Sequence, residues 1–191
     1  RAIEIYRNAL GIKPENFIIL KNLGIALLDK GELENAIFIF RKALDIDPKS
    51  LSVINHLATA YSRAERYKRA IQILKIGKKI KPNDAYVYAS IADIYRRDKK
   101  FKMSILYFEK ALDLDKKNSD FYNNMGVAFI DAEEYEKAID CYKKSLIINP
   151  SNIQAINNMG VVLTKTGSYM KAIEYFKKVL AIRSDDSEAF Y

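Results

Sequence analysis

The sequence predicts an all-α protein built from repeated helix pairs, and three observations support this prediction. Proline recurs every 34 residues at Pro14, Pro48 and Pro82, and Pro150 follows two periods later. Between these prolines, apolar residues recur at helical spacing in two stretches of about 12 to 14 residues. A residue that caps helices well stands before each first stretch. A period of this length is typical of proteins that stack one small structural element many times.

The proline spacing divides the chain into repeats of 34 residues. Residues 1–16 form a partial repeat, and residues 187–191 are expected to begin a further helix. The chain, residues 1–191, is therefore expected to be a single array. The five complete repeats are 17–50, 51–84, 85–118, 119–152 and 153–186.

Each complete repeat is expected to form a helical hairpin. In the first, Leu20, Leu23 and Leu27 fall on one face of the first expected helix. Phe40 and Leu44 fall on one face of the second helix in the same way. The proline near the end of a repeat stops the second helix, because it lacks an amide hydrogen and its ring clashes with the preceding turn.

The residue just before each expected first helix has a side chain that accepts hydrogen bonds. Such a side chain satisfies an amide of the first helical turn, which has no partner within the helix. The six predicted caps are Asn16, Ser50, Asp84, Asn118, Asn152 and Asp186.

Small residues recur where the two helices of a hairpin are expected to approach each other. The eighth residue of the repeats is Gly24, Ala58, Ala92, Gly126 or Gly160. The small residues expected to face it are Ala36, Ala70, Ser104, Ala138 and Ala172. Four residues later come the bulky residues Phe40, Leu74, Phe108, Tyr142 and Phe176.

These residues resemble the tetratricopeptide repeat, which has the same length, the early small residue, the small-xxx-aromatic pattern and the closing proline. The resemblance extends over the whole chain. It implies a right-handed superhelical solenoid of antiparallel helix pairs whose first helices line a concave groove. Lys116 and Ser184 depart from the pattern by replacing the proline. Lys78 departs by placing a charge where other repeats have leucine, which is expected to loosen the stacking there.

Composition is that of a soluble folded protein, with a net charge of +8 and one cysteine, Cys141. Charged residues interrupt every apolar stretch, so no membrane span is expected. The single cysteine permits no disulfide within the chain and fits a cytoplasmic or other intracellular compartment. Residues 63–102 contain thirteen Lys or Arg against four acids, a net +9, so the rest of the chain sums to −1.

No catalytic, cofactor or metal site is expected. His56 is the only histidine, and nothing in the repeat spacing brings a nucleophile and a carboxylate toward it. Because the glycines all fit the repeat frame, none of them suggests a phosphate-binding loop. The sequence therefore predicts a protein that is not an enzyme.

The candidate binding residues lie on the face of the first helices that lines the groove in the resembled family. Among them, polar residues recur at the fifth and sixth places of the repeats, with apolar and charged residues beside them. The predicted groove residues are Lys21, Asn22, Ile25, Asn55, His56, Thr59, Arg63, Tyr86, Ser90, Asp93, Arg96, Arg97, Asn123, Asn124, Val127, Asn157, Asn158 and Val161.

The repeated asparagines suggest contact with a peptide backbone. Asparagine inside a helix costs roughly 0.5–0.7 kcal/mol relative to alanine, so its recurrence asks for a reason. A carboxamide both donates and accepts hydrogen bonds, as a peptide group does. The pattern resembles the asparagine ladder in the repeat arm of O-linked N-acetylglucosamine transferase, interrupted here at His56 and Ser90. The alternative is a solvated polar groove with no ladder.

Charge favours an acidic protein or peptide partner over nucleic acid. Arg63, Arg96 and Arg97 are expected in the groove, whereas Lys68 and Arg69 belong to a second helix and the outer surface. The basic residues are thus divided between two faces. They are not interleaved with exposed aromatic residues, as binding of single-stranded nucleic acid would favour.

Three functions remain open at this point. The first is a non-enzymatic scaffold or adaptor that binds an extended peptide in the concave groove. The second is the substrate-recognition arm of a larger transferase, such as an O-GlcNAc transferase. The third is a self-assembling scaffold, in which the open ends of the array make a homo-oligomer.

Overall fold

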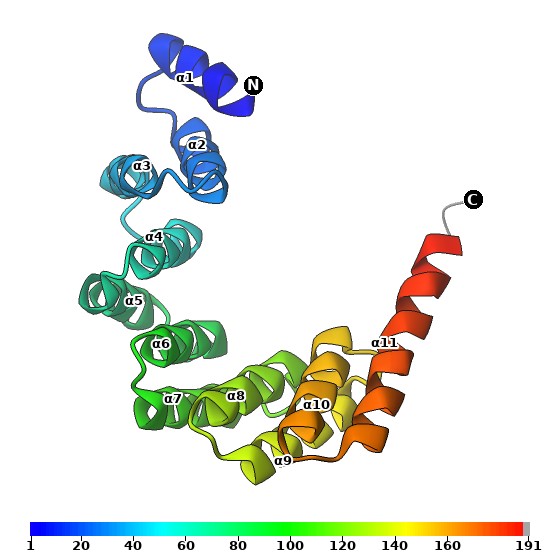
Figure 1. Ribbon diagram of the computed structural model, residues 1–191. Coiled ribbons are helices and arrows are strands. Elements are labelled where there is room, and N and C mark those ends of the chain that lie inside the picture. The colour runs from blue at the N-terminus through cyan, green and yellow to red at the C-terminus, as the bar shows by residue number, and fades with distance from the viewer. Residues whose placement is uncertain (189–191) are drawn as a thin grey trace. The chain divides into compact units, whose positions relative to one another are not determined.

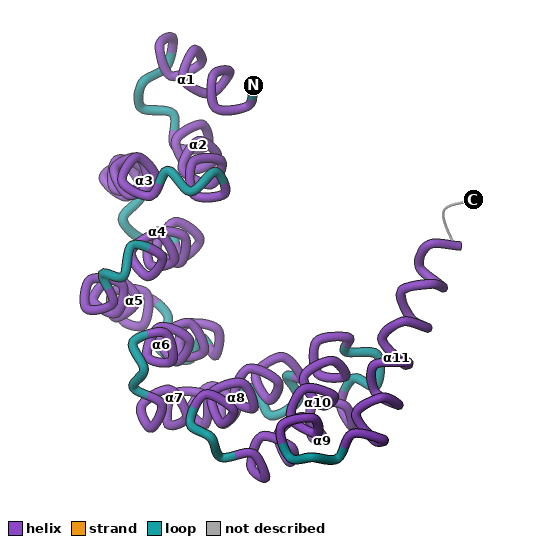
Figure 2. The backbone as a smooth tube through the Cα atoms, in the orientation of Figure 1, coloured by secondary structure: helices purple, strands orange, loops and turns teal. Residues whose placement is uncertain are grey.

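The computed structural model describes residues 1–188, and in that range it contains eleven helices and no strand (Figures 1 and 2). The first helices of the repeats are α2 (Phe17–Asp29), α4 (Leu51–Arg63), α6 (Ala85–Arg97), α8 (Ser119–Asp131) and α10 (Ile153–Lys165). The second helices are α1 (Ala2–Ile12), α3 (Leu33–Ile46), α5 (Tyr67–Ile80), α7 (Phe101–Leu114), α9 (Tyr135–Ile148) and α11 (Tyr169–Glu188).

The helices belong to two compact units, Arg1–Asp98 and Lys99–Tyr191, called unit 1 and unit 2 below. In unit 1, each helix packs against the next along the chain, and α4 also contacts both α2 and α6. In unit 2, α7 packs against α8, α8 against α9, and α10 against both α9 and α11, while α8 also contacts α10. Each unit thus stacks its helix pairs mainly by packing the second helix of one pair against the first helix of the next, with further contacts between neighbouring first helices. That 1–191 form one array stays a prediction.

The caps predicted from sequence begin the first helices. Each accepts a hydrogen bond from an amide of the first turn: Asn16, Ser50, Asp84, Asn118 and Asn152. Asp186 differs, because α11 continues through it to Glu188. Ser184 stands where other repeats have proline and keeps the amide hydrogen that proline lacks, so the helix can continue. The rest of the further helix predicted at 187–191 lies outside the described residues.

Close packing of small against large residues holds each helix pair together. Ala36, Ala70, Ala138 and Ala172 are buried as predicted. At the eighth place, a Cβ added to Gly126 would lie 2.5 Å from a ring atom of Tyr142, and one added to Gly24 would meet Phe40 at the same distance. Glycine thus makes room for the Phe40 and Tyr142 rings in these two repeats, whereas the repeat of Phe108 accommodates Ala92 at the same place. Phe40, Phe108 and Tyr142 are among the most deeply buried side chains.

The turns within the hairpins share one backbone conformation. Gly31 and Gly167 have positive φ, and Glu65, Lys99 and Glu133 adopt the same region at the same repeat position. This region suits glycine and costs other residues roughly 1–2 kcal/mol. The turn geometry is thus set by the repeat, whatever residue occupies it.

Lys78, whose charge is expected to loosen the stacking, is half-buried between α5 and α6. Its amine lies 4.9 Å from the ring centroid of Tyr88 on α6. The aliphatic stem packs while the charge meets the face of an aromatic ring, which attracts cations. The seam accommodates this lysine without leaving its charge unpaired.

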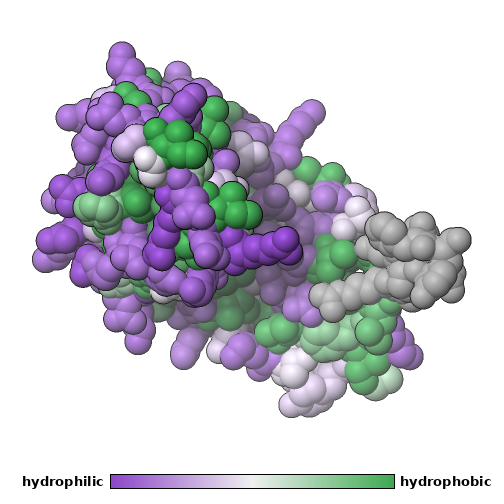
Figure 3. Space-filling model, turned by 90° about the horizontal axis from the view of Figure 1, so that it is seen from above, coloured by the Kyte–Doolittle hydropathy of each residue, from purple (hydrophilic) through white to green (hydrophobic). Residues whose placement is uncertain are grey.

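On the face drawn in Figure 3, hydrophobic residues form small patches separated by hydrophilic ones. Exposed apolar side chains of this kind include Ile5, Ile12 and Ile18. Scattered apolar side chains are normal on protein surfaces. These apolar side chains therefore do not mark a binding face, and the candidate sites are polar side chains and cavities.

Candidate functional site

The predicted groove residues lie on the first helices or at their ends, and we call this surface the first-helix face. In unit 1 it is formed by α2, α4 and α6, and in unit 2 by α8 and α10. Because neighbouring first helices contact each other within a unit, residues at matching repeat positions come close together. The structure thus gathers the predicted residues within each unit.

Asn123 on α8 is buried, with 2% of its surface exposed, although the sequence predicts it as a groove residue. Its Nδ2 donates a hydrogen bond to Oδ1 of Asn124 at 3.2 Å. Its Oδ1 accepts a hydrogen bond from Nδ2 of Asn158 on α10 at 3.0 Å. Both ends of the carboxamide are therefore satisfied inside the protein, because the neighbouring repeat supplies a second asparagine. Asn123 joins α8 to α10 and is not presented to a ligand.

Asn124 and Asn157 are exposed on α8 and α10. Asn124 accepts the hydrogen bond from Asn123 and keeps both of its own amide hydrogens. Asn158 is half-buried and donates toward Asn123. Of the four predicted groove asparagines in unit 2, Asn123 and Asn158 are thus engaged between helices, whereas Asn124 and Asn157 are exposed.

Unit 1 lacks the corresponding link. Asn55 on α4 occupies the fifth repeat place, as Asn123 does, and its Oδ1 is buried without a hydrogen-bond partner. The sixth place of the next repeat is Ser90, which is half-buried on α6. A serine is too short to replace the asparagine that fills this place in unit 2. Asn22 on α2 is also half-buried.

His56 is held by its own repeat and the one before it. Its Nδ1 lies 2.7 Å from the carbonyl oxygen of Ser52, one helical turn earlier. Its ring stacks on the ring of Phe40, with centroids 5.7 Å apart. His56 therefore packs α4 against α3.

Arg63, at the end of α4, reaches back to the preceding repeat. Its Nη1 donates a hydrogen bond of 2.7 Å to the carbonyl oxygen of Leu28, close to the end of α2. Carbonyls in the last turn of a helix carry partial negative charge, which attracts a cation. The Leu28 carbonyl also accepts a hydrogen bond from the amide of Gly31, and the arginine adds a second one that links two first helices of unit 1.

Arg96 and Arg97 are both paired with Asp93 on α6. Nη2 of Arg96 lies 2.9 Å from Oδ1 of Asp93, and Nε of Arg97 lies 2.8 Å from Oδ2. Burial alone would raise the pKa of Asp93, but the hydrogen bonds from Arg97 and Arg96 outweigh it and leave the pKa below its usual value. The carboxylate is thus charged and engages two of the arginines that the sequence assigns to a ligand.

The remaining predicted residues differ in their exposure on the first-helix face. Thr59 donates its hydroxyl hydrogen to the carbonyl of Asn55, one turn earlier. Tyr86 and Val161 are exposed, with 63% and 38% of their surface accessible. The half-buried members are Lys21, Ile25 and Val127.

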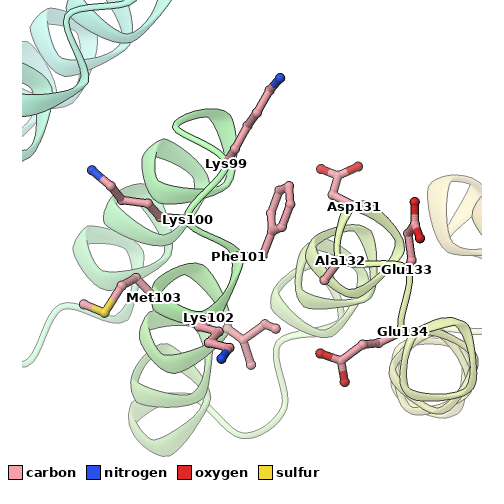
Figure 4. A pocket seen from close by; sticks show the side chains of 10 residues that line it. Lys99, Lys100, Phe101, Lys102, Met103, Asp131, Ala132, Glu133 and Glu134 are labelled. Atoms are coloured by element: carbon pink, nitrogen blue, oxygen red, sulfur yellow. The ribbon is translucent and has the colours of Figure 1, made fainter.

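A cavity of about 670 Å³ lies in unit 2, away from the first-helix face (Figure 4). It is formed between the start of α7 and the turn that joins α8 to α9. Phe101 stands between the two walls, with Lys99 on the α7 side and Asp131 and Glu133 on the α8 side (Figure 4). Sequence reasoning missed it because its walls come from two hairpin turns, and their alignment depends on stacking.

The described side chains form no metal cluster. Among residues 1–182, no group of three or more His, Cys, Asp or Glu side chains is placed to hold a metal ion. Burial raises the pKa of the Cys141 thiol to about 12, so this cysteine is not a nucleophile at neutral pH. None of the helices in this part of the chain combines the length and the apolar character that a bilayer crossing requires.

The stacked hairpins and their polar first-helix face are typical of helical repeat proteins that interact with other proteins. Sequence profiles described as tetratricopeptide repeat match residues 1–50, 27–94, 85–118, 119–152 and 141–174. The chain belongs to the tetratricopeptide repeat family. Such repeats are all-α solenoids, typically non-catalytic, and they bind protein or peptide partners.

Solved structures with the same fold include those of MamA, PilF and YrrB. MamA is 25% identical, with 88% of this chain and 98% of MamA covered and a TM-score of 0.66. PilF of Pseudomonas aeruginosa is 21% identical, with 95% of this chain and 78% of PilF covered and a TM-score of 0.70. YrrB, described as a TPR protein with an unusual peptide-binding site, is 20% identical, with 96% and 94% covered and a TM-score of 0.58. No curated protein matches the sequence significantly.

Proposed function

We propose that this chain is a non-enzymatic interaction scaffold that holds an extended peptide segment along its first-helix face. The observation that carries the proposal is the outward position of Asn124 and Asn157 on the neighbouring helices α8 and α10. Both have amide hydrogens available to a ligand. Asn124 accepts a hydrogen bond from Asn123 but donates none. YrrB, a structure of the same fold, is described with a peptide-binding site, which supports this class of ligand.

Binding would combine backbone recognition with contact to side chains. An extended peptide presents unpaired N–H and C=O groups along its length, and a carboxamide can satisfy either kind. Val127 and Val161 lie one helical turn beyond Asn123 and Asn157 and would meet the ligand's side chains. Because the helices are packed before the ligand arrives, little ordering of the protein opposes binding.

The test begins with peptides selected from a random displayed library on the purified chain. Their affinities for wild type and variants would be measured by fluorescence anisotropy. Asn124→Ala and Asn157→Ala should weaken peptides of different sequence by a similar factor, about 2 to 10, because one neutral hydrogen bond nets about 0.5–1.5 kcal/mol. Val161→Asp should instead weaken some selected peptides much more than others.

Asn8→Ala is the matched control, because Asn8 is an exposed helical asparagine on α1, away from the first-helix face. It should leave every affinity unchanged. Selected peptides that bind the Asn124→Ala and Asn157→Ala proteins as well as wild type, with folding intact, would contradict the proposal.

A further inference from the structure

Helix α5 carries an unbalanced positive charge. Its sequence contains Lys68, Arg69, Lys75, Lys78 and Lys79 and has no Asp or Glu. The other second helices do not share this feature, since α3 and α7 each carry two basic and two acidic residues. Five like charges on one helix are a departure from the pattern of the array.

Four of the five charges of α5 have no ion-pair partner. Lys68, Arg69, Lys75 and Lys79 are exposed, and none of them forms an ion pair with another described residue. This contrasts with Arg96 and Arg97, which are engaged by Asp93. Helix α5 therefore offers a partner a group of cations that no acidic side chain of the protein engages.

These side chains follow one stripe of the helix. Lys68, Lys75 and Lys79 are spaced by seven and four residues, with Gln72 between the first two, so they lie along the same side. Like charges four residues apart repel each other and destabilise a helix by a few tenths of a kcal/mol. Such a stripe lowers the stability of the fold and contributes nothing to it.

A cavity of about 540 Å³ opens beside this stripe, between α3 and α5. Its apolar walls are Ile37, Phe38 and Tyr61, and Phe38 is 57% exposed. Its basic rim includes Arg41 and Arg69. We call the stripe and this cavity together the α5 surface.

We propose that the α5 surface binds an acidic segment of a partner protein, with an apolar side chain of that segment in the cavity. Charge complementarity selects the acidic partner, because four unpaired cations lie within about three helical turns. The cavity favours a polypeptide partner over nucleic acid or a lipid bilayer. Its apolar walls accept a hydrophobic side chain, which a phosphate backbone does not offer, and of the two carboxylates at its edge Glu34 is already paired with Arg66.

The proposal is tested with a fluorescein-labelled synthetic peptide rich in Asp and Glu with one central Phe. Its affinity for the full chain is measured by anisotropy at about 50 and about 300 mM NaCl. Reversing Lys68, Lys75 and Lys79 to Glu should weaken binding at least tenfold at low salt and reduce the salt dependence. The same lysines changed to Gln should weaken binding less, which keeps the test available if the reversal harms folding.

The matched control reverses Lys171, Lys177 and Lys178 to Glu, three exposed lysines of α11 in unit 2. It changes the net charge equally and should alter the affinity less than about twofold. Phe38→Ala should weaken the peptide severalfold but leave a peptide with Ser in place of Phe unchanged. A fluorescein-labelled single-stranded DNA and phosphatidylserine vesicles serve as competing probes.

Three results would overturn the proposal. The first is equal weakening by the α5 and α11 reversals, since this would indicate bulk charge alone. The second is tighter binding of the DNA or the vesicles than of the acidic peptide through the same lysines. The third is indifference of the peptide to Phe38→Ala, because the cavity would then take no part.

Discussion

The first-helix faces of unit 1 and unit 2 use different side chains for their internal contacts. In unit 1, Arg63 on α4 reaches the carbonyl of Leu28 on α2, and Asp93 pairs with Arg96 and Arg97 within α6. In unit 2, the link between first helices is the amide pair Asn123 and Asn158. The charged side chains stand at the ninth, twelfth and thirteenth places of their repeats, and the two carboxamides at the fifth and sixth.

A residue's place in the repeat does not by itself determine its role. Asn55 and Asn123 share the fifth place, yet only Asn123 finds an asparagine on the following first helix. An asparagine that recurs at one repeat place can therefore be hydrogen-bonded to the next first helix in one repeat and lack that bond in another.

The largest expected effect comes from filling the eighth place in unit 2. Gly126→Ala should lower the free energy of unfolding by about 2–3 kcal/mol, because the new Cβ would lie 2.5 Å from the Tyr142 ring and force it to move. Urea denaturation followed by circular dichroism measures the change. Gly11→Ala on α1 is the control, since a Cβ there meets nothing within 4 Å and should stabilise the helix. Destabilisation of both variants alike would argue against the packing account.

Removing the buried asparagine should have the next largest effect. Asn123→Ala should lower the free energy of unfolding by about 2 kcal/mol, because it leaves the Asn158 amide without its partner and opens space among buried residues. Asn157→Ala, at the same repeat place but exposed, should be neutral or slightly stabilising. Equal losses from both would mean that Asn123 has no special structural role.

Unit 1 can be given the link that it lacks. Ser90→Asn should raise the free energy of unfolding by about 1 kcal/mol, because a carboxamide there can donate to the unpartnered Oδ1 of Asn55. The gain should disappear when Asn55 is also changed to Ala. A gain that survives Asn55→Ala would have to come from another contact.

The charge cluster of unit 1 should give the smallest effect and the only pH-dependent one. Asp93→Asn should cost about 0.5 kcal/mol near neutral pH, since the carboxylate is partly exposed and solvent weakens its ion pairs. The pKa of Asp93 is lower in the folded protein than in the unfolded chain, so its stabilisation is complete above the unfolded pKa. It should be lost as the pH falls through the folded pKa.

Denaturation of wild type and Asp93→Asn from neutral to acidic pH measures this loss. The difference between their free energies of unfolding should shrink as the pH falls below the usual carboxyl range. A difference that grows toward acid would show that the sign is wrong. The Asn123 variant should show no such dependence, because an amide does not titrate.

The fold was predictable because its signals are local in sequence. Asn118 caps α8 by accepting from the amide of Phe121, three residues later. The same holds for the small and bulky residues of one hairpin, as with Ala138 and Tyr142. Repetition then makes each local signal visible several times.

The site was less predictable because it depends on the register of neighbouring repeats. Whether Asn158 faces a ligand or Asn123 depends on contacts 35 residues apart, as does the bond from Arg63 to Leu28. The sequence places these residues on the correct helices but does not show which of them already have hydrogen-bond partners inside the protein. This depends on the residues that lie next to them after folding.

The central claim is that Asn123 and Asn158 are engaged with each other between α8 and α10, whereas Asn124 and Asn157 make no such contact with each other. A double-mutant cycle of Asn123→Ala and Asn158→Ala, measured by urea denaturation, tests it most directly, because the cycle isolates their interaction. The account predicts a coupling of about 0.5–1.5 kcal/mol for this pair. It predicts none for the exposed pair Asn124 and Asn157, changed in the same way. No measurable coupling between Asn123 and Asn158, or equal coupling in both pairs, would contradict the account.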